Sequence, residues 1–257
     1  MSYETVTIGT VPVANMNLHE TVDELAHLAS LPETSLVFTP NVDHLRMLQH
    51  NPALSAAYNQ ATLSVADGMP LVWASRLMGT PLPERVSGAD VEPLLCDRLQ
   101  QVGGHAIYLG GKTPSVTETA VSNRQGEYPK LRVSGLTPSM QFGSDAAETA
   151  KLLEQIEELH EPEQPTALFV CVGAPRSEIW AASNRQQLPP GVVMPVGAAI
   201  DLAAGAQQRA SEGMREHGFE WLHRLGQEPV RLAGRYAKDA VYAGRLLAGA
   251  TFKRITS

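Results

Sequence analysis

The stretch Leu36-Val-Phe-Thr-Pro-Asn-Val-Asp-His44 joins an apolar run to a polar turn and then to a helical pattern. Apolar residues like those at its start are typical of a buried β-strand. The same layout returns at residues 62–66, which are followed by Asp67-Gly-Met-Pro70. A strand, a polar tip and a helix are the repeating unit of a parallel sheet, and the carboxyl ends of its strands are where functional loops are expected.

The rest of the chain continues this alternation. We expect strands at residues 36–39, 62–66, 106–109, 131–134, 167–172 and 192–196. We expect helices at residues 42–60, 69–77, 89–102, 114–125, 146–160 and 175–187. Strands that alternate with helices predict an α/β fold, in which a mostly parallel, Rossmann-like sheet carries helices on both faces.

The strand pattern stops after Gly205, and two further helices are expected at residues 212–225 and 230–250. We therefore divide the chain into an α/β catalytic domain, residues 1–210, and a small helical C-terminal appendage, residues 211–257. From Arg224 to the end, seven Lys or Arg face two acids, although the whole chain carries −7. The appendage is thus the basic part of an acidic protein.

The basic residues of the last expected helix, Arg231, Arg235, Lys238 and Arg245, are spaced to form one stripe. An apolar stripe lies beside it, made of Leu232, Tyr236, Ala240, Ala243 and Leu247. Two interpretations remain open. The helix is either an ordinary solvated helix packed on the domain, or it contacts anionic lipid or a diphosphate.

The composition is that of a globular protein: 257 residues, 43% hydrophobic and 18% charged. We find no apolar stretch of about 20 residues and no leader-like start, so a cytoplasmic location is expected. The only cysteines, Cys96 and Cys171, fit a reducing compartment. The negative net charge argues against nucleic acid as a partner.

Three polar residues, two after predicted strands and one before a predicted helix, are candidates for chemistry. Asn41 and Asp67 each follow a strand, where either could simply cap the next helix. Asp67 could also act as a general base, because a sugar hydroxyl must lose its proton to a carboxylate during transfer. Arg85 precedes a capping box formed by Ser87 and Asp90, which leaves Arg85 itself unexplained. Its planar, charged fork suits a diphosphate.

The segment Tyr108-Leu-Gly-Gly-Lys-Thr-Pro114 is not a Walker loop, because Ala106 stands where the first glycine would be required. Its backbone N–H groups could still bind a phosphate, although a plain tight turn explains the glycines equally well. The sequence contains no Asp-X-Asp signature and no His or Cys cluster at metal spacing. We therefore expect no metal, and leaving-group charge would be met by arginines and helix N-termini.

A series of motifs in order resembles the WecG/TagA/CpsF glycosyltransferases, glycosyltransferase family 26, from about Thr39 to Tyr236. The motifs are TPNVDHL, ADGMPLVWASRLMGTPLPERVSGAD, YLGG, VGAPRSE, VGAAIDLAAG, RAS and FEWLHRLGQEPVRLAGRY. The resemblance implies an inverting, metal-independent enzyme without a cofactor. It implies a UDP-sugar donor, N-acetylmannosamine or its uronic acid among others, and an undecaprenyl-diphosphate-linked acceptor in cell-wall or capsule synthesis. It also implies an appendage that completes the active site and attaches it to the inner face of the membrane.

The resemblance also implies roles for individual residues. Asp67 would be the base and Arg85 would lie near the reacting groups. Thr39 and Asn41 would lie in the sugar pocket. The nucleotide side would hold Gly110, Gly111 and Asp201, and the appendage cations over the diphosphate would be Arg224, Arg231 and Arg235.

One position departs from the family pattern. Where the family usually reads Gly-X-Pro-X-Gln-Glu, this chain has Gly173-Ala-Pro-Arg-Ser-Glu178. Ser177 is shorter than the glutamine and cannot bridge two sugar hydroxyls, so the donor or acceptor is in question. This residue also motivates an alternative function, a catalytically silent homologue that binds a nucleotide sugar or serves as a scaffold. Exposed apolar surface around the appendage makes a homo-oligomer a further expectation.

Overall fold

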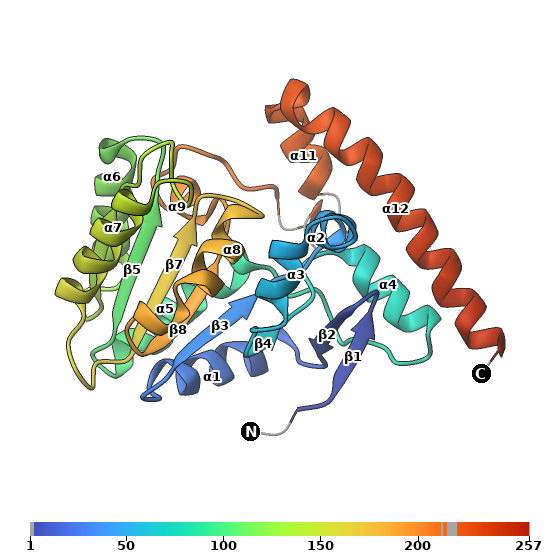
Figure 1. Ribbon diagram of the computed structural model, residues 1–257, viewed down its shortest axis with the longest axis horizontal. Helices are drawn as coiled ribbons and strands as arrows, with labels where there is room; N and C mark the ends of the chain where they lie inside the picture. The colour runs from blue at the N-terminus through green and yellow to red at the C-terminus, as the bar shows by residue number, and fades with distance from the viewer. Residues whose placement is uncertain (1–2, 212, 215–219, 257) are drawn as a thin grey trace.

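A six-stranded, all-parallel sheet forms the centre of the molecule, in the strand order β4-β3-β8-β7-β5-β6 (Figure 1). The computed structural model describes residues 3–211, 213–214 and 220–256, with the side chains of Arg231 and residues 253–256 outside the description. The strands are β3 (Thr34–Phe38), β4 (Leu63–Ser64), β5 (His105–Gly110), β6 (Arg132–Leu136), β7 (Thr166–Cys171) and β8 (Gly191–Pro195). The predicted α/β class with a parallel sheet is confirmed.

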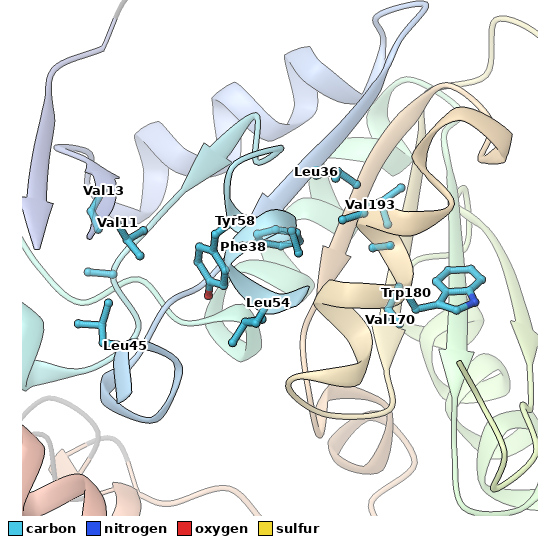
Figure 2. Close-up of a cluster of buried hydrophobic side chains, with 14 of the residues drawn as sticks. Val11, Val13, Leu36, Phe38, Leu45, Leu54, Tyr58, Val170, Trp180 and Val193 are labelled. Atoms are coloured by element: carbon cyan, nitrogen blue, oxygen red, sulfur yellow. The ribbon is translucent and has the colours of Figure 1, made fainter. Parts of the chain in front are cut away.

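Helices cover both faces of the sheet, because alternate strand residues are buried on opposite sides. Leu36 and Phe38 of β3 join one apolar cluster, and Val37 between them joins the other. The first cluster is completed by α2 (Val42–Leu48), α3 (Pro52–Tyr58), α4 (Met69–Leu77), α7 (Ala146–Leu159) and α8 (Arg176–Ser183). The second is completed by α1 (Leu18–Ala29), α5 (Gly88–Gln101), α6 (Pro114–Glu127) and α9 (Ala199–Ala203). Figure 2 shows the first cluster, with Tyr58 beside Phe38.

Several local expectations were wrong. The single helix expected at residues 42–60 is two helices, because the side chain of Asn51 caps a new helix that begins at Pro52. The helix expected at residues 175–187 ends at Ser183 and is followed by a short 3₁₀ turn, η1 (Arg185–Gln187). An N-terminal hairpin, β1 (Thr5–Ile8) and β2 (Val11–Ala14), and helix α1 were not predicted at all.

The C-terminal part contains α11 (Glu220–Gln227) and α12 (Pro229–Thr256). The expected helix at 212–225 overlaps residues 212 and 215–219, which lie outside the described residues. Helix α12 runs along α4 and α2 (Figure 1). Leu232 and Ala250 are buried, and Tyr242, Ala243, Leu246 and Leu247 pack against the first apolar cluster. The apolar stripe of α12 is therefore largely a packing surface. Among the described helices, none is long and apolar enough to cross a bilayer.

Candidate active site

Asp67 lies in the turn between β4 and α4, at the carboxyl edge of the sheet. The residue that caps α4 is Gly68, whose φ of +132° favours glycine, and no side chain caps this helix. The capping explanation of Asp67 is therefore wrong. The backbone N–H of Asp67 donates to the carbonyl oxygen of Pro40 at 2.9 Å, which ties this turn to the one after β3. The Asp67 carboxylate therefore lies at the sheet edge without capping a helix.

Arg85 holds three carboxylates together around that turn. Its guanidinium lies 3.5 Å from Asp67, 2.8 Å from Asp90 and 3.1 Å from Glu220 of α11. Asp90 is held in place by α5, where Ser87 caps the helix as the sequence indicated, and by Arg209 at 2.5 Å. Arg85, for which the sequence offered no structural explanation, is thus the centre of a charge cluster that includes Glu220 of the appendage.

The environment of Asp67 changes its acidity. Burial is the largest effect and raises the pKa of the Asp67 carboxyl, and the nearby Glu220 raises it further. Arg85, Arg224 and His44 act in the opposite direction, and the pKa settles at about 6. Above that pH Asp67 is mainly ionised, yet it holds a proton more tightly than an ordinary aspartate. Such a carboxylate is suited to accept a proton near neutral pH.

Thr39 and Asn41 lie in the turn after β3, where Thr39 is buried. The side-chain oxygen of Asn41 accepts the N–H of His44 at 3.1 Å, so the capping role of Asn41 is confirmed. A Cβ atom placed on Gly68 would lie 3.9 Å from the Cβ atom of Asn41, which puts the turns after β3 and β4 in contact. Capping uses the amide oxygen of Asn41, and its NH₂ group remains a donor for a ligand.

Ser177 is placed less favourably for binding. It is almost completely buried, and its hydroxyl donates to the carbonyl oxygen of Gly173 at 3.3 Å, in the loop that leads into α8. The neighbouring Glu178 is also buried and approaches His44, with 3.2 Å between Oε1 and Nε2. The hydroxyl of Ser177 therefore bonds to the backbone of the loop that precedes its own helix.

Gly110 and Gly111 have structural reasons to be glycines. A Cβ atom at Gly110 would lie 2.5 Å from the Cβ atom of Cys171 on β7, and Gly111 has φ of +90°. The turn that follows brings Lys112 to a cavity of about 440 Å³, which Asp201 also lines. Gln227 and Glu228 of the appendage complete its wall. Burial, the largest effect, raises the pKa of Asp201, and Lys112 partly opposes this.

The three candidate cations of the appendage have different positions. Arg224 lies 3.7 Å from Glu220 and lowers the pKa of Asp67, so it belongs to the Asp67 group. Arg235 lies 3.8 Å from Asp43 of α2 and stacks over the ring of Tyr236. The side chain of Arg231 is outside the described residues. The structure therefore brings Asp67, Arg85 and Arg224 together, with Asn41 adjacent, and it places Asp201 at a separate cavity.

Sequence reasoning missed several members of the site: Glu220, Arg209, Lys112, and the pair His44 and Glu178. All of these residues stand inside the quoted motifs or directly beside them, but their partners lie far away in the chain. Within the described ranges, no three His, Cys, Asp or Glu side chains gather as a metal site would require.

The sequence profile of the Glycosyl transferase WecG/TagA/CpsF family matches residues 6–256, almost the whole chain. The chain belongs to this family. A Bacillus spizizenii relative, named N-acetylglucosaminyldiphosphoundecaprenol N-acetyl-beta-D-mannosaminyltransferase, is 25% identical over 70% of this chain and 66% of its own length. A relative of the same name from Staphylococcus aureus is 28% identical over 73% of this chain and 70% of its own. The match spans just under two thirds of the Bacillus protein. Because the chain belongs to a glycosyltransferase family, the predicted class of enzyme, a glycosyltransferase, is confirmed.

Replacing Glu220 by glutamine should lower the pKa of Asp67 in this glycosyltransferase. Glu220 raises that pKa by charge repulsion, and the amide removes the charge while it keeps the size of the side chain. We expect the titration midpoint of Asp67 to fall by a few tenths of a unit to about one unit. A ¹³C NMR titration of the Asp67 carboxyl group measures this directly. An unchanged or higher midpoint would contradict the assigned arrangement of charges.

Proposed function

We propose that this protein transfers a sugar from a UDP donor to a polyprenyl-diphosphate-linked glycan, with inversion and without a metal ion, and that Asp67 is its general base. One observation supports the proposal most strongly. A carboxylate with no capping role, a pKa of about 6 and an arginine at 3.5 Å stands at the carboxyl edge of the sheet. This is what deprotonation of a sugar hydroxyl next to a departing diphosphate requires.

In the proposed reaction a carboxylate accepts a proton and arginines stabilise the leaving group. Asp67 takes the proton of the acceptor hydroxyl as its oxygen attacks the anomeric carbon from the face opposite the UDP, so the configuration is inverted. The bond between the anomeric carbon and the diphosphate breaks, and negative charge develops on the leaving oxygen. Arg85 and Arg224 would stabilise that charge, because cations already in place need no reorganisation during the reaction. Thr39 and Asn41 would hold the sugar.

The names of the relatives support the choice of substrates. Both are named for transfer of N-acetyl-beta-D-mannosamine to N-acetylglucosaminyldiphosphoundecaprenol. We propose N-acetylmannosamine or a related hexose or uronic acid as the donated sugar, in cell-wall polymer, capsule or exopolysaccharide synthesis. The cavity beside Asp201 and Lys112 is the proposed nucleotide side. Gly110 and Gly111 would serve it through the turn that presents Lys112.

Attachment of the appendage to the inner face of the membrane is part of the proposal, since the acceptor is a lipid. The last 34 residues carry seven Lys or Arg. On α11 and α12 the large apolar side chains of Trp221, Leu222, Val241 and Phe252 are exposed. Cations and apolar side chains together are what binds a protein to an anionic lipid surface.

The test is UDP release from a panel of UDP-sugars, with the lipid-diphosphate acceptor in vesicles and with EDTA present. We expect one donor, N-acetylmannosamine or a close relative, to be turned over at an undiminished rate after chelation. Asp67→Asn is the matched control, and it should bind UDP without transferring sugar.

Two outcomes would overturn parts of the proposal. If turnover vanishes with EDTA and returns with a divalent cation, the proposal that transfer needs no metal ion is wrong. UDP binding without transfer from any donor, and unaffected by Asp67→Asn, would favour the alternative, a silent nucleotide-sugar-binding or scaffold homologue.

A further inference from the structure

A buried pair of side chains joins the corner between β3 and α2, which holds Thr39 and Asn41, to the corner between β7 and α8. His44 is the third residue of α2, and Glu178 lies in the first turn of α8. Their Nε2 and Oε1 atoms are 3.2 Å apart, and the two residues are 7% and 5% exposed. Between their strands, β3 and β7, lies β8, so the pair spans the width of a strand. His44 lowers the pKa of Asp67, but the proposed reaction assigns no step to either side chain.

The hydrogen bonds of His44 define which ring nitrogen carries the proton. The backbone N–H of Asn41 lies 3.2 Å from Nδ1 and can only donate, so Nδ1 must be an unprotonated acceptor. In a neutral ring the proton is then on Nε2, which donates to Glu178. The carboxylate of Glu178 therefore selects the tautomer that the Asn41 backbone needs.

That backbone group belongs to the same peptide unit that anchors the general base. The N–H of Asn41 and the carbonyl oxygen of Pro40 are the two ends of one peptide plane. The carbonyl accepts the N–H of Asp67 at 2.9 Å, and the N–H donates to His44. Glu178, His44, the Pro40–Asn41 peptide and the backbone of Asp67 thus form one continuous hydrogen-bonded path.

Stability alone gives little reason for this pair. Glu178 Oε2 and the hydroxyl of Tyr58, whose ring packs 6.2 Å from that of His44, are buried with no hydrogen-bond partner among the described residues. A buried polar pair with unsatisfied atoms is usually no more stabilising than apolar residues of the same volume. The arrangement is better explained by the geometry that it imposes.

We propose that His44 and Glu178 are positioning residues, which hold the Pro40–Asn41 peptide, and through it Asp67, in the orientation needed for transfer. This inference rests on the proposed base role of Asp67. Neither side chain touches the substrate. Their effect is on where the base and the Asn41 amide stand relative to the acceptor hydroxyl, and small errors in such placement slow a reaction strongly.

Two substitutions of Glu178 separate positioning from packing. Glu178→Gln keeps an oxygen that accepts the Nε2 proton, whereas Glu178→Leu removes the acceptor and the buried charge. We expect the Leu variant to lose roughly 10- to 100-fold in kcat with KM for the donor changed less than about twofold. The Gln variant should stay within about threefold of the wild type. The Tm of the Leu variant should fall moderately, because the buried Nε2–H of His44 loses its acceptor, so kcat is compared at a temperature where all three proteins are folded.

An NMR experiment tests the same idea without any turnover. In protein labelled with ¹⁵N-histidine, the ring of His44 should show a protonated Nε2 and an unprotonated Nδ1 at pH 8 in the wild type and the Gln variant. In the Leu variant both tautomers should appear, and the amide resonances of Asn41 and Asp67 should shift. A protonated Nδ1 in the wild type, or unshifted amides in the Leu variant, would overturn the proposal.

The two experiments also distinguish the inference from the function on which it rests. If the wild type transfers no sugar but the NMR results are as expected, the proposed reaction fails and the hydrogen-bonded path stands. If the wild type is active and the folded Leu variant is equally active, the positioning role fails and the reaction stands.

Discussion

Asp67→Asn is expected to reduce sugar transfer strongly while it makes the protein more stable at pH 8. Loss of a general base lowers kcat by about 10²- to 10⁴-fold, and asparagine retains the size of the side chain but cannot take a proton. The KM for the donor should change little, because Asp67 is proposed to act on the acceptor hydroxyl. A fixed-time assay of UDP release with the preferred donor measures the loss.

The gain in stability follows from the pKa of about 6, which is above the ordinary 3.8. A raised pKa means that the folded state favours the protonated form, so ionising Asp67 costs stability. This cost is absent below pH 3.8, grows between 3.8 and about 6, and is fully present above that. The side chain is 28% exposed and contacts Arg85, so we expect about 1 to 2 kcal/mol of stabilisation on substitution at pH 8.

Thermal unfolding at pH 8 and pH 4 checks the sign of this stability change, since the Asp67→Asn substitution should raise Tm only at the higher pH. The exposed helix residue Asp97 offers a matched control, and Asp97→Asn should leave both activity and Tm nearly unchanged. An Asp67→Asn protein that is less stable at pH 8 would show that the carboxylate supports the fold, contrary to its assigned role.

The alternation of strands and helices was predictable because a buried parallel strand is apolar throughout and its length is short. The same reasoning failed near Asn51. Apolar residues continue through residues 42–60, but a capping asparagine followed by proline starts a second helix there. The hairpin at Thr5–Ile8 and Val11–Ala14 was missed because two strands of four residues carry too little pattern.

The site was predictable only where its residues follow strands. Asp67 and Asn41 stand at strand ends, a position that sequence can recognise. Glu220 and Arg209 enter the cluster because the chain returns to Arg85 and Asp90 more than 100 residues later, and a pairing at that distance leaves no local pattern. Resemblance suggested that three appendage arginines would close over the diphosphate. The structure shows Arg224 near Asp67 and Arg235 on Asp43.

Arg85→Ala should have the second largest effect, because it removes the cation around which the cluster is organised. Loss of one preorganised group that stabilises transition-state charge costs about 3 to 4 kcal/mol, or 10²- to 10³-fold in kcat/KM. Arg85→Lys keeps the charge but not the fork that reaches Asp67, Asp90 and Glu220 together, so its loss should be intermediate.

The pH dependence gives Arg85→Ala a signature that simple damage to the fold would not produce. Arg85 is the largest influence that lowers the pKa of Asp67, so without it that pKa should rise above about 6. The acid limb of the kcat/KM profile should then move to higher pH, opposite to the change expected for Glu220→Gln. Arg98→Ala is the control, since Arg98 pairs with Asp23 on the exposed surface. If the acid limb of Arg85→Ala stayed in place, Asp67 would not be the group whose ionisation controls transfer.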